Sequence, residues 1–201
     1  MAKTNKNEES NQEVDFSKRS QWLRAALLGA NDGLLSTASL MMGVGAVRKD
    51  ARTMVLAGIA GLVAGACSMA IGEFVSVYSQ HDMAVAEMER KESRRGGPGE
   101  AVMKAEMESL PNPFQAAGAS AMAFAVGAAV PLLPAAFIRA YRWRVAVVVA
   151  VSSAALLGFG GLGAYLGRAP YMKSCFRVLI GGWVAMAITF AVSKSFDVLG
   201  F

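Results

Sequence analysis

The chain has 201 residues, of which 54% are hydrophobic, and its mean hydropathy is +0.39. That is more apolar surface than a soluble domain of this size can bury, so the composition indicates an integral membrane protein. The net charge of +5 does not indicate nucleic-acid binding, because the cations flank apolar runs and no interleaving of basic and aromatic residues is present in the sequence.

Residues 1–20 are polar and mixed in charge. They contain no apolar core of the kind that a signal peptide needs, so we expect the first apolar run to stay in the protein. Their composition predicts a disordered tail. The two cysteines of the chain are too few for a disulfide framework.

The first apolar run, residues 22–47, exceeds the roughly 20 residues that a helix needs to cross a bilayer. Asn31 and Asp32 interrupt it, and a carboxylate inside a membrane is costly and rare unless it has a function. We predict a spanning helix with one small and polar face that includes Asp32. The rest of that face follows at helical spacing in Ser36, Ser39 and Gly43.

The second apolar run, residues 53–78, contains another carboxylate, Glu73. Met69 precedes Glu73 by four residues, which places both side chains on the same face of a helix. Small residues on nearly the same face predict a close approach by a neighbouring helix. These residues are Gly58, Gly61 and Gly65.

Residues 79–112 are charged and contain no long apolar run. Their pattern predicts a cytosolic hairpin of two short amphipathic helices, residues 82–94 and 100–110, separated by the GGPG sequence.

Glutamates and methionines of this hairpin are candidates for a cytosolic metal-collecting surface. We single out Glu87, Glu106 and Met107. The alternative is an ordinary solvated helix face, because Lys and Arg are interspersed among the acids. His81 is the only histidine of the chain, and we expect it to be a surface residue rather than a ligand.

The remaining residues, 113–201, contain three further apolar runs, which are residues 113–138, 145–166 and 178–196. Pro131 and Pro134 should kink or unwind the far end of the first of these helices. Five spans place the termini on opposite sides of the membrane. Lys and Arg are more numerous on the side of the N-terminus and the hairpin, which predicts that this side is cytosolic.

Asp32 and Glu73 are the carboxylates that the membrane interior has to accommodate. One interpretation is that each lies close enough to the end of its span to reach headgroup water. The other pairs them across the first two helices, as oxygen ligands for a cation or as proton carriers. The thioether of Met69 favours Fe(II) or another late first-row metal, although packing alone is the alternative for a membrane methionine. No nucleophile arrangement, phosphate loop or zinc spacing is present in the sequence, so we expect neither an enzyme nor a tightly bound cofactor.

Three motifs carry a resemblance to a known family: Asn31-Asp32-Gly33, residues 68–80 (SMAIGEFVSVYSQ) and residues 110–117 (LPNPFQAA). They resemble the vacuolar iron transporter family, and its short, nodulin-like branch in particular. The similarity extends from about residue 19 to the C-terminus.

The resemblance implies a five-span, dimeric carrier that moves Fe(II), and often Mn(II), out of the cytosol in exchange for protons. It implies that Asp32 and Met69 are pore-lining metal contacts and that Glu73 belongs to the shared motif. Two departures put regulation and proton coupling in doubt. The cytosolic region is shorter than in full-length members, and Gly61 stands near the position where some members have a further glutamate.

We therefore predict an all-α integral membrane protein with five transmembrane helices and a short cytosolic helical hairpin between the second and third. Residues 21–78 would line a metal path in a homodimer embedded in the bilayer. The chain would export Fe(II) or Mn(II), with proton exchange, into a vacuole in a eukaryote or across the plasma (inner) membrane in a bacterium. The alternatives are a non-transporting assembly protein and a proton-coupled carrier of an organic solute.

Overall fold

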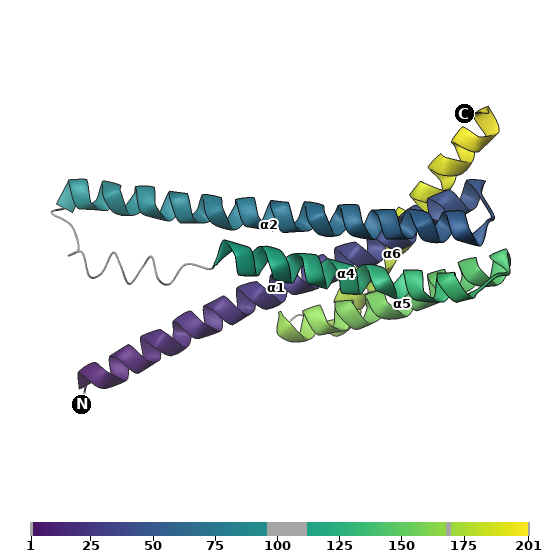
Figure 1. Ribbon diagram of the computed structural model, residues 1–201. Helices are drawn as coiled ribbons and strands as arrows, with labels where there is room; N and C mark the ends of the chain where they lie inside the picture. Colours follow the sequence, from purple (N-terminus) through teal and green to yellow (C-terminus); the bar gives the residue numbers. More distant parts are fainter. Residues whose placement is uncertain (1, 96–111, 168–169, 201) are drawn as a thin grey trace.

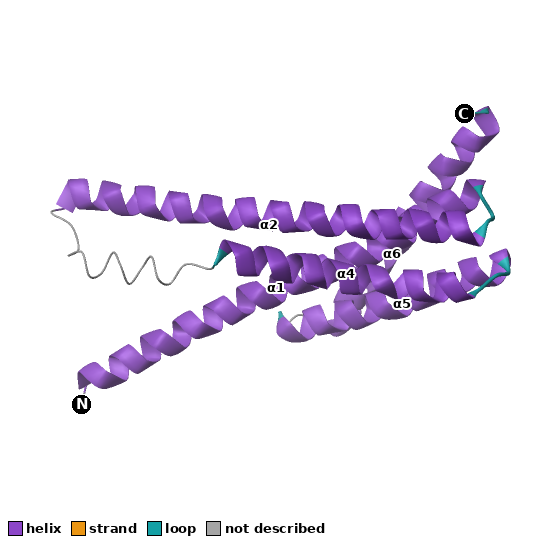
Figure 2. Ribbon diagram, viewed as in Figure 1, coloured by secondary structure: helices purple, strands orange, loops and turns teal. Residues whose placement is uncertain are grey.

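The computed structural model describes residues 2–95, 112–167 and 170–200. Within these ranges the chain forms helices and no strands, which confirms the all-α fold (Figure 2). The helices are α1 (Ala2–Val47), α2 (Ala51–Arg95), α4 (Pro113–Phe137), α5 (Tyr141–Leu166) and α6 (Tyr171–Leu199).

The helices run up and down along one long axis, and the two termini lie at opposite ends of it (Figure 1). The central helix is α1, which contacts all four others. Helix α4 packs between α1 and α2 and also contacts α5, whereas α6 packs on α1 and α5. Within the described ranges, α2 makes extensive contact with α1 and α4 only.

Four helices, α2, α4, α5 and α6, are long and apolar enough to cross a membrane. Their outward faces expose large apolar side chains, as expected where lipid is the solvent. Helix α1 is more polar, because Asn31, Asp32 and several hydroxyl residues dilute its apolar run. Its crossing of the membrane therefore stays a prediction.

The composition of residues 1–20 predicts a disordered tail, whereas the structure begins α1 at Ala2. No glycine or proline occurs before Gly29, so nothing in the local sequence ends a helix that continues outward from the apolar run.

The predicted boundary between the second span and the hairpin is also absent. Helix α2 continues without a break to Arg95, because no glycine or proline lies between Gly72 and Gly96. The first arm of the predicted hairpin is thus an extension of the spanning helix. The second arm, residues 100–110, lies outside the described residues.

Helix α4 has a well-defined start. The side chain of Asn112 accepts hydrogen bonds from the backbone N–H groups of Phe114 at 3.0 Å and Gln115 at 3.4 Å, and Pro113 occupies the first turn as predicted. The predicted unwinding at the far end is absent, because the helix continues through Pro131 and Pro134 to Phe137.

Helices α5 and α6 begin four and seven residues before the predicted spans. Their first two turns carry exposed cations, which a helix that projects into the headgroup region can accommodate. These residues are Arg142, Lys173 and Arg177.

The predicted close approach along the glycines of α2 is confirmed. A methyl group added at Gly58 would lie 3.0 Å from the sulfur of Met41 on α1, and one added at Gly61 would lie 2.7 Å from Leu40. At Gly65 the added group would overlap the ring of Phe124 on α4. The three glycines therefore let both α1 and α4 approach the α2 backbone closely.

Candidate metal site on the first two helices

Asp32 lies on the open side of α1. Its carboxylate is half-buried and accepts a hydrogen bond of 3.0 Å from the hydroxyl of Ser36, one turn further along. Leu28 is 63% exposed and Leu40 is 38% exposed, at the same four-residue spacing. We call Leu28, Asp32, Ser36 and Leu40 the α1 stripe. No described ion pair neutralises the carboxylate at its centre.

The opposite side of α1 is fixed against α4 by glycines. A methyl group added at Gly33 would overlap the backbone of Phe124, and one added at Gly127 would overlap the backbone of Ala30. At Gly29 the added group would lie 2.9 Å from the carbonyl oxygen of Ser120. The two backbones are therefore in contact, and Asp32 lies at the height of the middle of α4.

Met69 and Glu73 lie on α2, alongside α4. Both side chains are half-buried. They lie between two contacts of α2 with α4, the packing of Gly65 on Phe124 and the ring contact of Phe74 with Phe114 at 5.1 Å between centroids. Met69 therefore lies along the first half of α4, and Glu73 lies one turn nearer the start of α4.

Phe124 relates the two halves of the candidate site. Its backbone touches Gly33, next to Asp32, and its ring touches Gly65, one turn before Met69. Asp32 and Met69 thus lie at a similar height, on two helices that both contact Phe124 of α4. The described residues contain no group of three or more His, Cys, Asp or Glu side chains that could hold a metal ion. Within one protomer, so far as it is described, the predicted donors thus lie on two helices that pack on α4.

Buried oxygen atoms near this level were not recognised as candidates from the sequence. The side-chain oxygen atoms of Asn31 and Ser120 are buried and have no hydrogen-bond partner within the described part of the chain. The hydroxyls of three further residues are also buried without a partner among the described residues, and these are Thr37, Ser39 and Ser152. Buried polar groups normally find partners, so such atoms mark places where water or a ligand can bind. The only signal in the sequence is hydroxyl and amide residues inside apolar runs.

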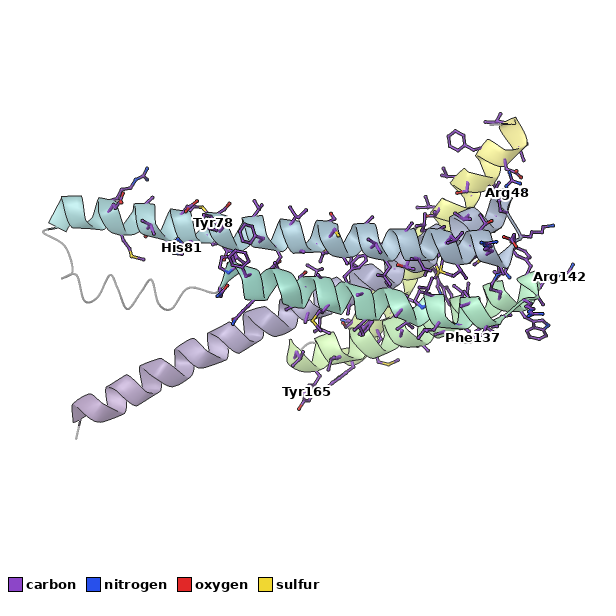
Figure 3. All side chains as sticks on the ribbon, in the orientation of Figure 1. Arg48, Tyr78, His81, Phe137, Arg142 and Tyr165 are labelled. Carbon is purple, nitrogen blue, oxygen red and sulfur yellow. The ribbon has the colours of Figure 1, made fainter. Side chains whose placement is uncertain are left out.

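The hairpin candidates are only partly described. Glu87 is exposed on the extension of α2, whereas Glu106 and Met107 lie outside the described residues. The ring of His81 lies 6.3 Å from that of Tyr78, one turn earlier, and is half-buried (Figure 3). The extension therefore presents acids and thioethers along one continuous helix rather than on a separate hairpin arm.

Known proteins resemble this chain over most of its length. A profile of the VIT family matches residues 23–101 and 95–194. The chain is 62% identical over 180 residues to vacuolar iron transporter homolog 1 of Arabidopsis thaliana, covering 90% of this chain and 86% of that protein. It is 60% identical over 188 residues to vacuolar iron transporter homolog 5 of Oryza sativa subsp. japonica, covering 94% and 86%. It is 57% identical over 186 residues to VIT-like transporter 1b of Glycine max, covering 92% and 81%.

Proposed function

Since the chain belongs to the VIT family, the vacuolar iron transporters, we propose that it exports Fe(II), Mn(II) or both from the cytosol into a vacuole. The observation that carries the proposal is Asp32, a carboxylate on a helix packed among four apolar helices long enough to span a membrane. Among the described residues its hydrogen-bond partner is the hydroxyl of Ser36. Such a group is expensive in a membrane unless a cation or a proton visits it.

The choice of metal follows from the donors at this height. Asp32 and Glu73 supply hard oxygen atoms and Met69 supplies a soft thioether sulfur, a combination that suits late first-row divalent ions better than magnesium or calcium. Asn31, next to Asp32, has a buried amide oxygen without a partner in the described part of the chain, so it would be a further neutral donor.

A second copy of the chain would complete the site. The α1 stripe places a carboxylate and a hydroxyl between two exposed leucines, so it is a poor surface to leave against lipid. Packing two copies through this stripe would face two Asp32 side chains across a two-fold axis and remove both from lipid. The metal path would then lie between protomers rather than inside one.

Proton exchange would give the transport its direction. A carboxylate must lose its proton to bind a metal ion, so protonation from an acidic compartment favours release on that side. The acids and methionines on the extension of α2, Glu87 among them, would concentrate metal at the cytosolic entrance.

The test is metal uptake into proteoliposomes. The wild-type chain should carry Fe(II) and Mn(II) faster than Mg(II) or Ca(II) when the lumen is acidic, and Asp32→Asn should abolish this uptake. Lys194→Gln is the control, because it removes a surface charge that already pairs with Asp197 at 2.7 Å. Normal uptake by Asp32→Asn would contradict the proposal, as would failure of the wild-type chain to rescue cells that are sensitive to iron.

A further inference from the structure

The end of the bundle opposite the hairpin carries a concentration of positive charge. Two short loops, residues 48–50 and 138–140, meet at this end (Figure 2). Five exposed cations lie in these loops and in the first helical residues after them. We call them the cationic end patch: Arg48, Lys49, Arg52, Arg139 and Arg142.

Arg144 supports this patch from inside the bundle. Its side chain is completely buried at the start of α5. Its guanidinium donates hydrogen bonds to the carbonyl oxygen of Lys49 at 2.6 Å, and to those of Ile138 at 3.2 Å and Arg139 at 3.1 Å. One side chain thus holds both loops side by side, and the patch is a fixed structure.

Little negative charge opposes the patch. Asp50 is the only acidic residue of the two loops, and its carboxylate accepts hydrogen bonds from the N–H and hydroxyl of Thr53, at 2.9 and 3.0 Å. Those hydrogen bonds lower the pKa of Asp50, and the positive charge of Arg144 lowers it further. Because the Asp50 carboxylate already accepts hydrogen bonds from the first turn of α2, the exposed cations remain available to another anion.

Aromatic side chains place the patch at the depth of lipid headgroups. Phe137 ends α4 with 82% of its side chain exposed, and Trp143 in the first turn of α5 is 69% exposed. Exposed aromatic residues at the ends of spanning helices lie in the interface between lipid tails and water. Arg139 and Arg142 lie between these two aromatics in the sequence, and Arg142, Arg48 and Phe137 all lie toward this end (Figure 3).

We propose that the cationic end patch is a binding site for the phosphate groups of anionic phospholipids. Guanidinium groups bind phosphate oxygens in a bidentate manner, and the aromatics hold these guanidinium groups at phosphate depth. Charge complementarity and depth together select a lipid headgroup over a soluble anion. This role is independent of the metal path and goes beyond the proposed function.

The test uses Trp143 as a reporter. In a full-length chain carrying Trp22→Phe and Trp183→Phe, Trp143 is the only tryptophan left of the three. This protein is reconstituted in phosphatidylcholine with a fraction of brominated lipid, which is either phosphatidylglycerol or phosphatidylcholine. Brominated phosphatidylglycerol should quench Trp143 more strongly, with a preference of about fivefold for each cation that contacts the lipid. High salt should reduce the preference.

Matched variants locate the site. Arg139→Gln with Arg142→Gln should remove most of the preference, and Arg48→Gln with Lys49→Gln from the other loop should reduce it independently. Lys173→Gln with Arg177→Gln removes the same charge at the far end of the bundle and should leave the preference intact. Quenching by brominated phosphatidylcholine checks that Trp143 remains at the interface in every variant.

Two results would overturn the proposal. Equal quenching by the two brominated lipids, or an unchanged preference in both loop variants, would mean that the patch does not select anionic lipid. Loss of the preference on adding inorganic phosphate, but not chloride at the same ionic strength, would mean that the patch takes a free anion instead.

Discussion

Two regions of the bundle differ in how their buried polar groups are paired. At the end with the cationic patch, Arg144 donates to three carbonyl oxygens and Tyr141 donates its hydroxyl to the carbonyl oxygen of Gly45 at 2.8 Å. Near Asp32, Asn31 and Ser120 have buried oxygen atoms without a partner among the described residues. The polar groups of the first region join helices, whereas these two oxygen atoms join none within the described part of the chain.

The largest expected effect on stability concerns Arg144, at the end with the cationic end patch. Arg144→Leu leaves three loop carbonyls without their donor, so it should lower the free energy of unfolding by about 3–5 kcal/mol. Thermal unfolding in detergent measures this change. The exposed neighbour Arg142→Gln is the control and should have little effect. Equal stability of the two variants would mean that Arg144 is no clamp.

The next effect concerns the contact between α1 and α4. Gly33→Ala places a methyl group into the backbone of Phe124, so the helices must separate, at a cost of about 1–3 kcal/mol. Gly72→Ala is the matched control, because nothing lies within 4 Å of the added group. It should be neutral or stabilise α2. Unfolding measurements on the two variants test whether the contact between α1 and α4 holds Asp32 in place. Equal stability of the two variants would contradict this role of the contact.

A smaller effect should separate ligand binding from stability. Ser36→Ala removes the hydroxyl that orients Asp32, so it should weaken the apparent affinity for Fe(II) about two- to tenfold while unfolding stays unchanged. Ser195→Ala is the control, because that hydroxyl donates to the carbonyl oxygen of Ala191 on its own helix. Initial rates of uptake at several metal concentrations give the affinity. A loss of stability without a loss of affinity would mean that Ser36 stabilises the fold and does not take part in metal binding.

The smallest effect is the pH dependence of the start of α2. Since folding lowers the pKa of Asp50, its hydrogen bonds to Thr53 stabilise the fold above the ordinary pKa and are lost as the pH falls through the lowered value. Stability should therefore decline below about pH 4 in the wild type. Asp50→Asn should show less of this decline when unfolding is followed between pH 3 and 6. An identical decline in both proteins would remove Asp50 as its cause.

Local features of the fold were predictable from the sequence. Apolar length located the spanning regions, Pro113 marked the start of α4, and the small residues of α2 marked its packed face. The continuation of helices beyond the apolar runs was missed at residues 2–20 and 79–95. Apolar length shows where lipid begins, but it does not show where a helix ends.

The relative placement of the candidate ligands was not predictable. It depends on Phe124, whose backbone and ring contact two different helices, and no local pattern indicates such a double contact. Arg144 was counted only as one of several cations at the end of a span. Its partners are backbone carbonyls, which every residue has, so no sequence motif marks a buried clamp of this kind.

The clamp at Arg144 also determines where the bundle can move. It joins the loop between α1 and α2 to the loop between α4 and α5, so we expect the cationic end to keep its shape in any rearrangement of the helices. A rearrangement would then have to loosen the packing of Gly33 and Gly65 on Phe124. Such a change would alter the spacing between Asp32 and Met69.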